Sequence, residues 1–177
     1  MELTNRETWT ALHGMVFGSL FLLAFAGGLA GLWSLRPEWV TVSGLQERMM
    51  RLKAGVTAMA LVAWITVISG TWIVYPWYRE RPPQGETDLE KYPRYFLLDD
   101  PRLDGWHTFV MEWKEHLAWI SPILATAVAF VVVYYGNQLI VDRRLRNITI
   151  GMFILAFAVA GIAGLLGAFI TKAAPIT

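Results

Sequence analysis

The sequence predicts an all-α integral membrane protein, a four-transmembrane-helix up-and-down bundle with one extended external loop between helices 2 and 3. Four stretches of at least 25 residues contain no Asp, Glu, Lys or Arg, although these residues make up 16% of the chain. About 20 mostly apolar residues cross a bilayer as a helix, because the hydrocarbon core is about 30 Å thick and each residue rises about 1.5 Å. The stretches lie between Glu7 and Arg36, Lys53 and Arg79, Glu115 and Asp142, and Arg146 and Lys172.

The four predicted spans form one membrane domain that covers residues 1–177. Uniformly apolar runs of this length exclude barrel strands, which alternate in polarity and cross a membrane in about ten residues. An even number of crossings places both termini on one side of the membrane. We predict spans at about residues 10–33, 54–75, 116–136 and 148–171, with the external loop at about 76–115.

Aromatic and small residues support the first, second and last spans. Trp9 and Trp33 bracket span 1 and Tyr75 closes span 2, because amphipathic rings prefer the headgroup level. Small residues at four-residue spacing let membrane helices approach closely, within this bundle or against a partner subunit. Such residues are also simply common in membrane helices, so both interpretations stay open. They are Gly14, Gly18, Gly27 and Gly31 on span 1, and Ala156, Ala160, Gly164 and Ala168 on span 4.

The third span follows a turn-rich part of the loop. Asp100 followed by Pro101 has the pattern of a helix start, a capping carboxylate and then proline in the first turn. A helix that begins there could run directly into span 3. Pro122 should kink span 3, because its ring removes one backbone hydrogen bond and clashes with the preceding turn.

Lysine and arginine predict the orientation, because short cytoplasmic loops are enriched in them. The two short connections carry seven such residues, whereas the eight on the other side are spread over more chain and mixed with eleven acids. We therefore predict a multi-pass protein of an inner or cytoplasmic-type membrane, with both termini and the long loop external. The seven residues are Arg36, Arg48, Arg51, Lys53, Arg143, Arg144 and Arg146.

Two of the three histidines fall at similar depth in different spans. His13 lies about one turn inside span 1, and His116 opens span 3. In an up-and-down bundle these spans are diagonal, so inward-pointing imidazoles can hold a planar cofactor in the core. We predict a haem iron bound by both histidines, with Glu112 orienting His116 and with Gly14 and Gly18 leaving a groove for the porphyrin.

Four spans with a histidine in the first and third resemble the four-helix b-type cytochrome subunits that anchor respiratory enzymes and exchange electrons with quinones. The resemblance implies a haem-b subunit that carries electrons within a larger respiratory or photosynthetic redox complex, with a quinol as a candidate electron donor. Spans 2 and 4 contain no histidine, so a two-haem arrangement is excluded and a single haem would lie near the external surface. The absence of cysteine also excludes covalent c-type haem attachment.

The histidines have other interpretations. His13 and His116 can instead make ordinary hydrogen bonds at the membrane boundary. His107 is a candidate for proton exchange with a quinol near the surface, or a solvated histidine of the loop. His107 precedes His116 by nine residues, which on a continuous helix is about 180° of rotation, so the two should face opposite sides.

The competing hypothesis is a cofactor-free accessory or scaffolding subunit that holds other membrane-protein subunits or lipid. We find no catalytic motif, so any enzymatic role is that of a non-catalytic or quinol-oxidising subunit of an oxidoreductase complex. The formal net charge of +1 and the lack of a basic patch exclude nucleic acid as a partner. No predicted span carries a central charged residue to line an ion path, which disfavours a channel or transporter.

Overall fold

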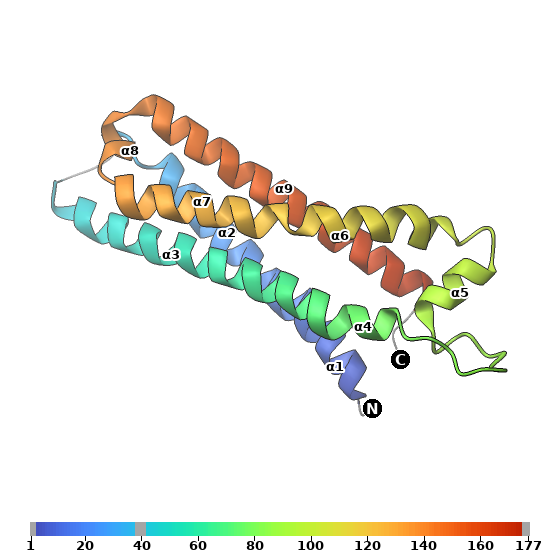
Figure 1. The fold of residues 1–177 in the computed structure, drawn as a ribbon. Helices are drawn as coiled ribbons and strands as arrows, with labels where there is room; N and C mark the ends of the chain where they lie inside the picture. The colour runs from blue at the N-terminus through green and yellow to red at the C-terminus, as the bar shows by residue number, and fades with distance from the viewer. Residues whose placement is uncertain (1–2, 38–41, 175–177) are drawn as a thin grey trace.

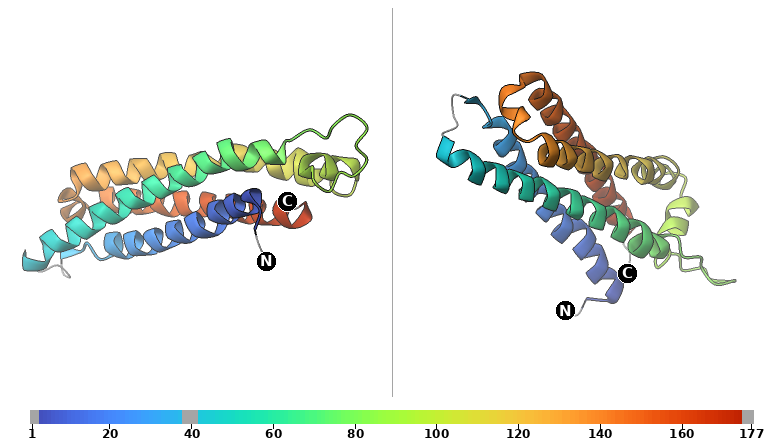
Figure 2. Two further views of the ribbon diagram at one scale, coloured as in Figure 1. Left: turned by 90° about the horizontal axis from the view of Figure 1, so that it is seen from below. Right: turned by 60° about the vertical axis from the view of Figure 1, so that its left-hand side comes forward.

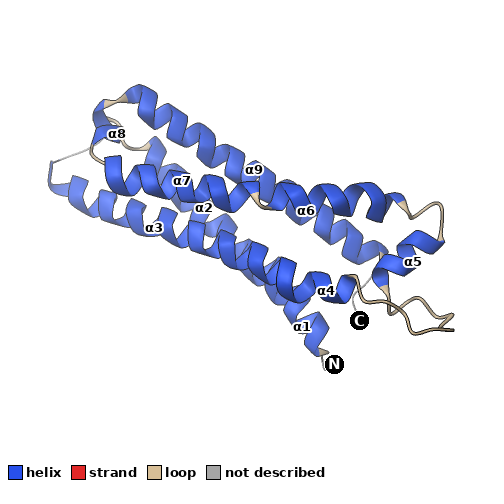
Figure 3. Ribbon diagram, in the orientation of Figure 1, coloured by secondary structure: helices blue, strands red, loops and turns tan. Residues whose placement is uncertain are grey.

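The computed structural model describes residues 3–37 and 42–174, which form four long helical rods lying side by side (Figure 1). All four rods are long and apolar enough to cross a membrane, so the predicted four-helix membrane bundle is confirmed. The described residues contain helices and loops and no strand (Figure 3). The rods extend beyond the predicted spans and cover Asn5–Trp33, Gly44–Tyr78, Trp106–Tyr135 and Arg143–Ala173.

Most rods consist of several helical segments, and three of them contain a short π-helical segment (η). The first rod comprises α1 (Asn5–Ala11), η1 (Leu12–Phe17) and α2 (Gly18–Trp33). The second comprises α3 (Val42–Ser69), η3 (Gly70–Val74) and α4 (Tyr75–Tyr78). The third comprises η4 (Trp106–Met111), α6 (Glu112–Ala118) and α7 (Ile120–Tyr135), and the fourth is α9 (Arg143–Ala173). Two short helices lie between rods, α5 (Pro93–Asp99) and α8 (Gln138–Val141).

Each rod packs against its neighbours in the chain, and the fourth also packs against the first. The first and third rods therefore occupy diagonal positions. Both chain ends lie at the same end of the bundle as the long loop, as the views in Figures 1 and 2 show. We call this end the loop end, and we call the opposite end, where the short connections lie, the basic end.

Aromatic stacking and small residues hold the first and fourth rods together. The Phe25 ring stacks on Phe153 and Phe157, with ring centroids 4.8 and 3.9 Å apart. A Cβ at Gly28 would lie only 2.6 Å from Cζ of Phe153, so glycine is required for this approach. By contrast, nothing lies within 4 Å of a Cβ built at Gly14 or Gly18. Small residues thus mediate packing at one part of the first rod and leave an open surface at another.

The third rod begins a few residues after the helix start predicted at Asp100 and Pro101, and it is interrupted near its proline. Residues 101–104 form turns, and the helix of the rod starts only after them. In these turns the Arg102 side chain hydrogen-bonds the Asp100 carboxylate, which lowers the pKa of Asp100 to about 2. The helix is interrupted at Trp119, in the turn before Pro122, whose missing N–H and ring disfavour a regular helix at the place where the kink is predicted.

The loop between the second and third rods is shorter than predicted. The sequence places it at about 76–115, but residues 106–115 belong to the third rod and Pro93–Asp99 form α5. A charge-free run marks only the part of a helix within hydrocarbon and leaves out polar turns that continue the same helix. Several charged side chains of the segment predicted as external loop therefore lie on the helix of the third rod.

Arg146 organises the basic end of the bundle. Its side chain is 9% exposed, and Nη1 donates to the backbone carbonyl oxygens of Leu35, Leu139 and Ile140 at 3.0 to 3.1 Å. Leu35 follows the end of α2, and Leu139 and Ile140 lie in the four-residue helix α8, where carbonyl oxygens of the last turn have no intrahelical partner. Asp142 caps α9 by accepting from the backbone N–H of Leu145 at 2.9 Å. Together these contacts fix the connections at this end.

Candidate functional site

Three of the four rods contain π-helical segments, and all three lie toward the loop end. η1 packs against α3 and α9, and η4 packs against α9. A π-helical turn holds one more residue than an α-helical turn, is rare, and occurs frequently at functional sites. His13 lies in η1, Gly70 opens η3, and His107 lies in η4. The irregular turns therefore coincide with two of the three histidines.

His13 points toward the second rod, where a hydrogen-bond chain determines which ring nitrogen carries its proton. Nδ1 of His13 lies 3.1 Å from Oγ of Ser69, and that hydroxyl donates to the Thr66 carbonyl oxygen at 3.0 Å. With the hydroxyl proton donated to Thr66, we assign Nδ1 as the donor to Oγ. Nε2 of the neutral ring is therefore unprotonated and can accept a proton or bind a metal.

Gly70 is required for this position of the ring. A Cβ at residue 70 would lie 2.6 Å from Cε1 and 3.1 Å from Nε2 of His13. Any larger side chain would push the imidazole away from Ser69. Backbone shape and side-chain hydrogen bonding thus place His13 between the first and second rods.

Lys114 and Glu115 bring charge into the same part of the bundle from the third rod. Both side chains are half-buried. The Lys114 stem packs on the fourth rod, since a Cβ at Gly167 would lie 2.8 Å from Cε of Lys114. Tyr75 from the second rod lies near Glu115, and Lys114 is near enough to His13 to act on it electrostatically. We define the polar core as His13, Ser69, Tyr75, Lys114 and Glu115.

The polar core is incompletely satisfied. Oε1 of Glu115 is enclosed by protein and has no hydrogen-bond partner among residues 3–37 and 42–174. Within the same residues, Lys114 has no ion pair within 4 Å. A buried polar atom without a partner costs about 1–3 kcal/mol. The carboxylate therefore keeps an unused hydrogen-bonding position that can take a proton, and ionisable groups held between transmembrane helices are usually functional.

His107 has a structural role that its sequence position does not reveal. Its side chain is 5% exposed, so the interpretation as a solvated loop histidine is wrong. Nε2 accepts from Nε of Arg94 at 3.1 Å, so Nδ1 carries the proton and donates to the Tyr78 hydroxyl at 2.9 Å. These bonds tie the α5 region to the second and third rods. Proton exchange through His107 would first require Arg94 to break its hydrogen bond to Nε2 of the imidazole.

His116 lies on the exposed side of the third rod. Its Nδ1 donates to the backbone carbonyl oxygen of Glu112 at 2.7 Å, so Glu112 orients it through the main chain and not through its carboxylate. Gly14 is likewise exposed. In the described part of the chain, no hydrogen bond or ring contact joins His13 to His116, which point to different surroundings. Nor do these residues contain a cluster of three or more His, Asp or Glu that could hold a metal ion.

No protein family model matches this chain. Comparisons with curated proteins and with solved structures likewise gave no match. The chemistry of the site is therefore inferred from the residues of this chain alone.

Proposed function

We propose that this chain is a subunit of a larger membrane complex, in which its polar core transfers protons at the loop end. The observation that carries the proposal is the unpartnered carboxylate oxygen of Glu115, next to Lys114 on the third rod, with His13 of the first rod near enough to Lys114 to feel its charge. Membrane proteins keep such groups where protons or ions pass. The open surface at Gly14 and Gly18 supports membership of a complex, because a neighbouring helix can approach closely there.

Each group has a chemical role in this proposal. The Glu115 carboxylate takes a proton at its unpartnered Oε1, beside the Tyr75 side chain. Lys114 is near enough to Glu115 for their opposite charges to interact. The unprotonated Nε2 of His13 is the second acceptor, and its Nδ1–H bond to Ser69 keeps this nitrogen free. Bases of these two kinds suit protons delivered by water or by a membrane-soluble quinol.

Glu115→Gln tests the proposal, because the amide keeps the shape of the side chain but cannot take up a proton. The complex that co-purifies with a tag on this chain is reconstituted into vesicles, and quinol-driven release or uptake of protons is followed with a pH-sensitive dye. We expect normal assembly and a loss of proton-coupled turnover of about 10²-fold, the usual contribution of a positioned acid or base.

Glu90→Gln is the matched control, since Glu90 is an exposed acid of the loop. This variant should retain the full proton-coupled rate. If the Glu115→Gln complex assembles and also retains the full rate, proton transfer by the polar core is ruled out, and the scaffolding hypothesis is favoured.

Haem binding is a second candidate function, and the histidine hydrogen bonds favour it. In both His13 and His116 the proton is on Nδ1 and Nε2 is free, which is how an iron-ligating histidine is normally held. A haem between the two would require His116 to turn from the exposed side into the bundle.

An optical spectrum of the chemically reduced complex tests the haem candidate. Haem bound by this chain gives a Soret band that is lost in both His13→Ala and His116→Ala. A band that survives both substitutions, or no band at all, excludes haem on these histidines and leaves the proton-transfer proposal intact.

A further inference from the structure

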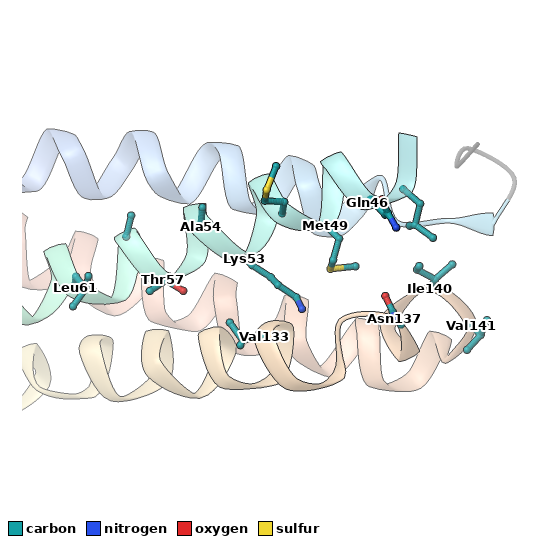
Figure 4. Close-up of a pocket in the computed structure, with 13 residues that line it drawn as sticks. Gln46, Met49, Lys53, Ala54, Thr57, Leu61, Val133, Asn137, Ile140 and Val141 are labelled. Carbon is teal, nitrogen blue, oxygen red and sulfur yellow. The ribbon is translucent and has the colours of Figure 1, made fainter. Parts of the chain in front are cut away.

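A groove of about 1090 Å³ runs along the basic end of the bundle, between the second and third rods (Figure 4). Its walls come from α3, α7 and α8. Small side chains of α3 form much of one wall, because Ala54 and Ala58 leave space that larger residues would fill. The groove lies on the outer surface of the bundle, so a membrane component can enter it sideways.

The groove continues toward the middle of the membrane. A second hollow of about 430 Å³ shares Thr57, Leu61 and Val133 with the first and extends to Trp64. There Nε1 of Trp64 donates to Oγ1 of Thr126 at 2.9 Å and joins the two rods. From Lys53 to Trp64 the helix rises about 16 Å. This is about half of a 30 Å hydrocarbon core, the depth that one lipid leaflet occupies.

The end of the groove near the short connections is polar and positively charged. Gln46, Lys53 and Asn137 line it, and no acidic residue does. Figure 4 shows Lys53 reaching from α3 toward α7, between Val133 and Asn137. Among residues 3–37 and 42–174, Lys53 has no ion pair within 4 Å. Its ammonium therefore has room for an anionic partner from outside the chain.

Gly136 allows this position of Lys53. A Cβ at residue 136 would lie 3.3 Å from Cε of Lys53 and 2.7 Å from Sδ of Met49. The lysine stem thus packs on the C-terminal end of α7 and directs its ammonium to the groove. Met49 supplies a flexible apolar wall beside it.

We infer that this groove binds one anionic phospholipid. Its phosphate lies at Lys53, with hydrogen bonds from the Gln46 and Asn137 amides, and one acyl chain follows the groove to Trp64. Basic pockets between transmembrane helices bind anionic headgroups in this way. A quinone would fill the apolar part of the groove but would leave the Lys53 ammonium without an anionic partner.

Lipid retention tests the charged end of the groove. The purified protein is placed in nanodiscs of equal phosphatidylglycerol and phosphatidylcholine, extracted with mild detergent, and analysed by native mass spectrometry. We expect one retained phosphatidylglycerol in the unaltered protein and about fivefold less retention in Lys53→Gln. Arg144→Gln is the control, because Arg144 is an exposed cation at the same end that does not line the groove.

The apolar part of the groove is tested separately. Ala58→Phe fills the groove and should prevent retention of the lipid, whereas Ala158→Phe, on the exposed surface of α9, should not. Equal retention by Lys53→Gln and the unaltered protein would overturn the inference. So would retention of phosphatidylcholine in preference to phosphatidylglycerol, or of quinone in place of phospholipid.

Discussion

Replacing Arg146 with methionine is expected to lower the free energy of unfolding by about 3 kcal/mol, because buried carbonyls lose their hydrogen-bond donor. A single nitrogen of Arg146 serves three backbone carbonyl oxygens, those of Leu35, Leu139 and Ile140. Methionine has a similar length and fills the space but donates no hydrogen bond. Reversible unfolding of the purified protein in detergent, followed by tryptophan fluorescence, measures the change.

Arg144→Met is the control for this prediction. Arg144 is exposed in the same helical turn region, so its loss should change the free energy of unfolding by no more than about 0.5 kcal/mol. Equal effects of the two substitutions would show that the loss of a positive charge, and not the three carbonyl contacts, accounts for the destabilisation.

Gly70→Ala is expected to displace His13 and to destabilise the bundle by about 1–3 kcal/mol, the usual effect of overpacking. The added methyl group would lie 2.6 Å from the imidazole, so the ring must move and its hydrogen bond to Ser69 must break. In protein labelled with ¹⁵N-histidine, the signals of His13 should change while those of His107 and His116 stay in place. Three histidines in the whole chain make this assignment feasible.

Gly55→Ala is the matched control in the same rod. Nothing lies within 4 Å of a Cβ at Gly55, so alanine should fit and should stabilise the helix by about 0.5–1 kcal/mol. Opposite signs for the two substitutions are expected. If both substitutions destabilise the protein, the effect comes from the helix backbone and not from displacement of His13.

The sequence predicts the four rods well because charged residues are excluded from the hydrocarbon core and gather in the connections between helices. The break before Pro122 is equally predictable, since it follows from the chemistry of a single residue. The surroundings of Lys114 and Glu115 are not predictable in this way, because charged side chains suggest water where the fold instead places them between rods. Their position in the bundle depends on partners from other rods, such as Tyr75 and Gly167, which no local pattern reveals.

The histidines show the same limit at the candidate site. The position of each histidine along its rod follows from the sequence. The side of the rod that its imidazole faces depends on the number of residues per helical turn, which a π-helical turn changes. The nine-residue spacing predicts that His107 and His116 face opposite sides, and one is indeed buried while the other is exposed. Once His107 is inside, His116 points outward. Ser69 and Gly70 were not predicted as site residues, because neither carries a chemical signal until His13 is placed beside it.

The arrangement of the connections makes the two faces of this protein very unequal. Both chain ends, α5 and the long loop gather at one end, whereas α8 and two brief connections lie at the other (Figure 2). A water-soluble protein that approaches the first face meets folded polypeptide standing above the lipid. At the opposite end, only α8 and the short connections lie outside the rods in the described part of the chain, so the polypeptide surface open to a water-soluble protein is larger at the loop end.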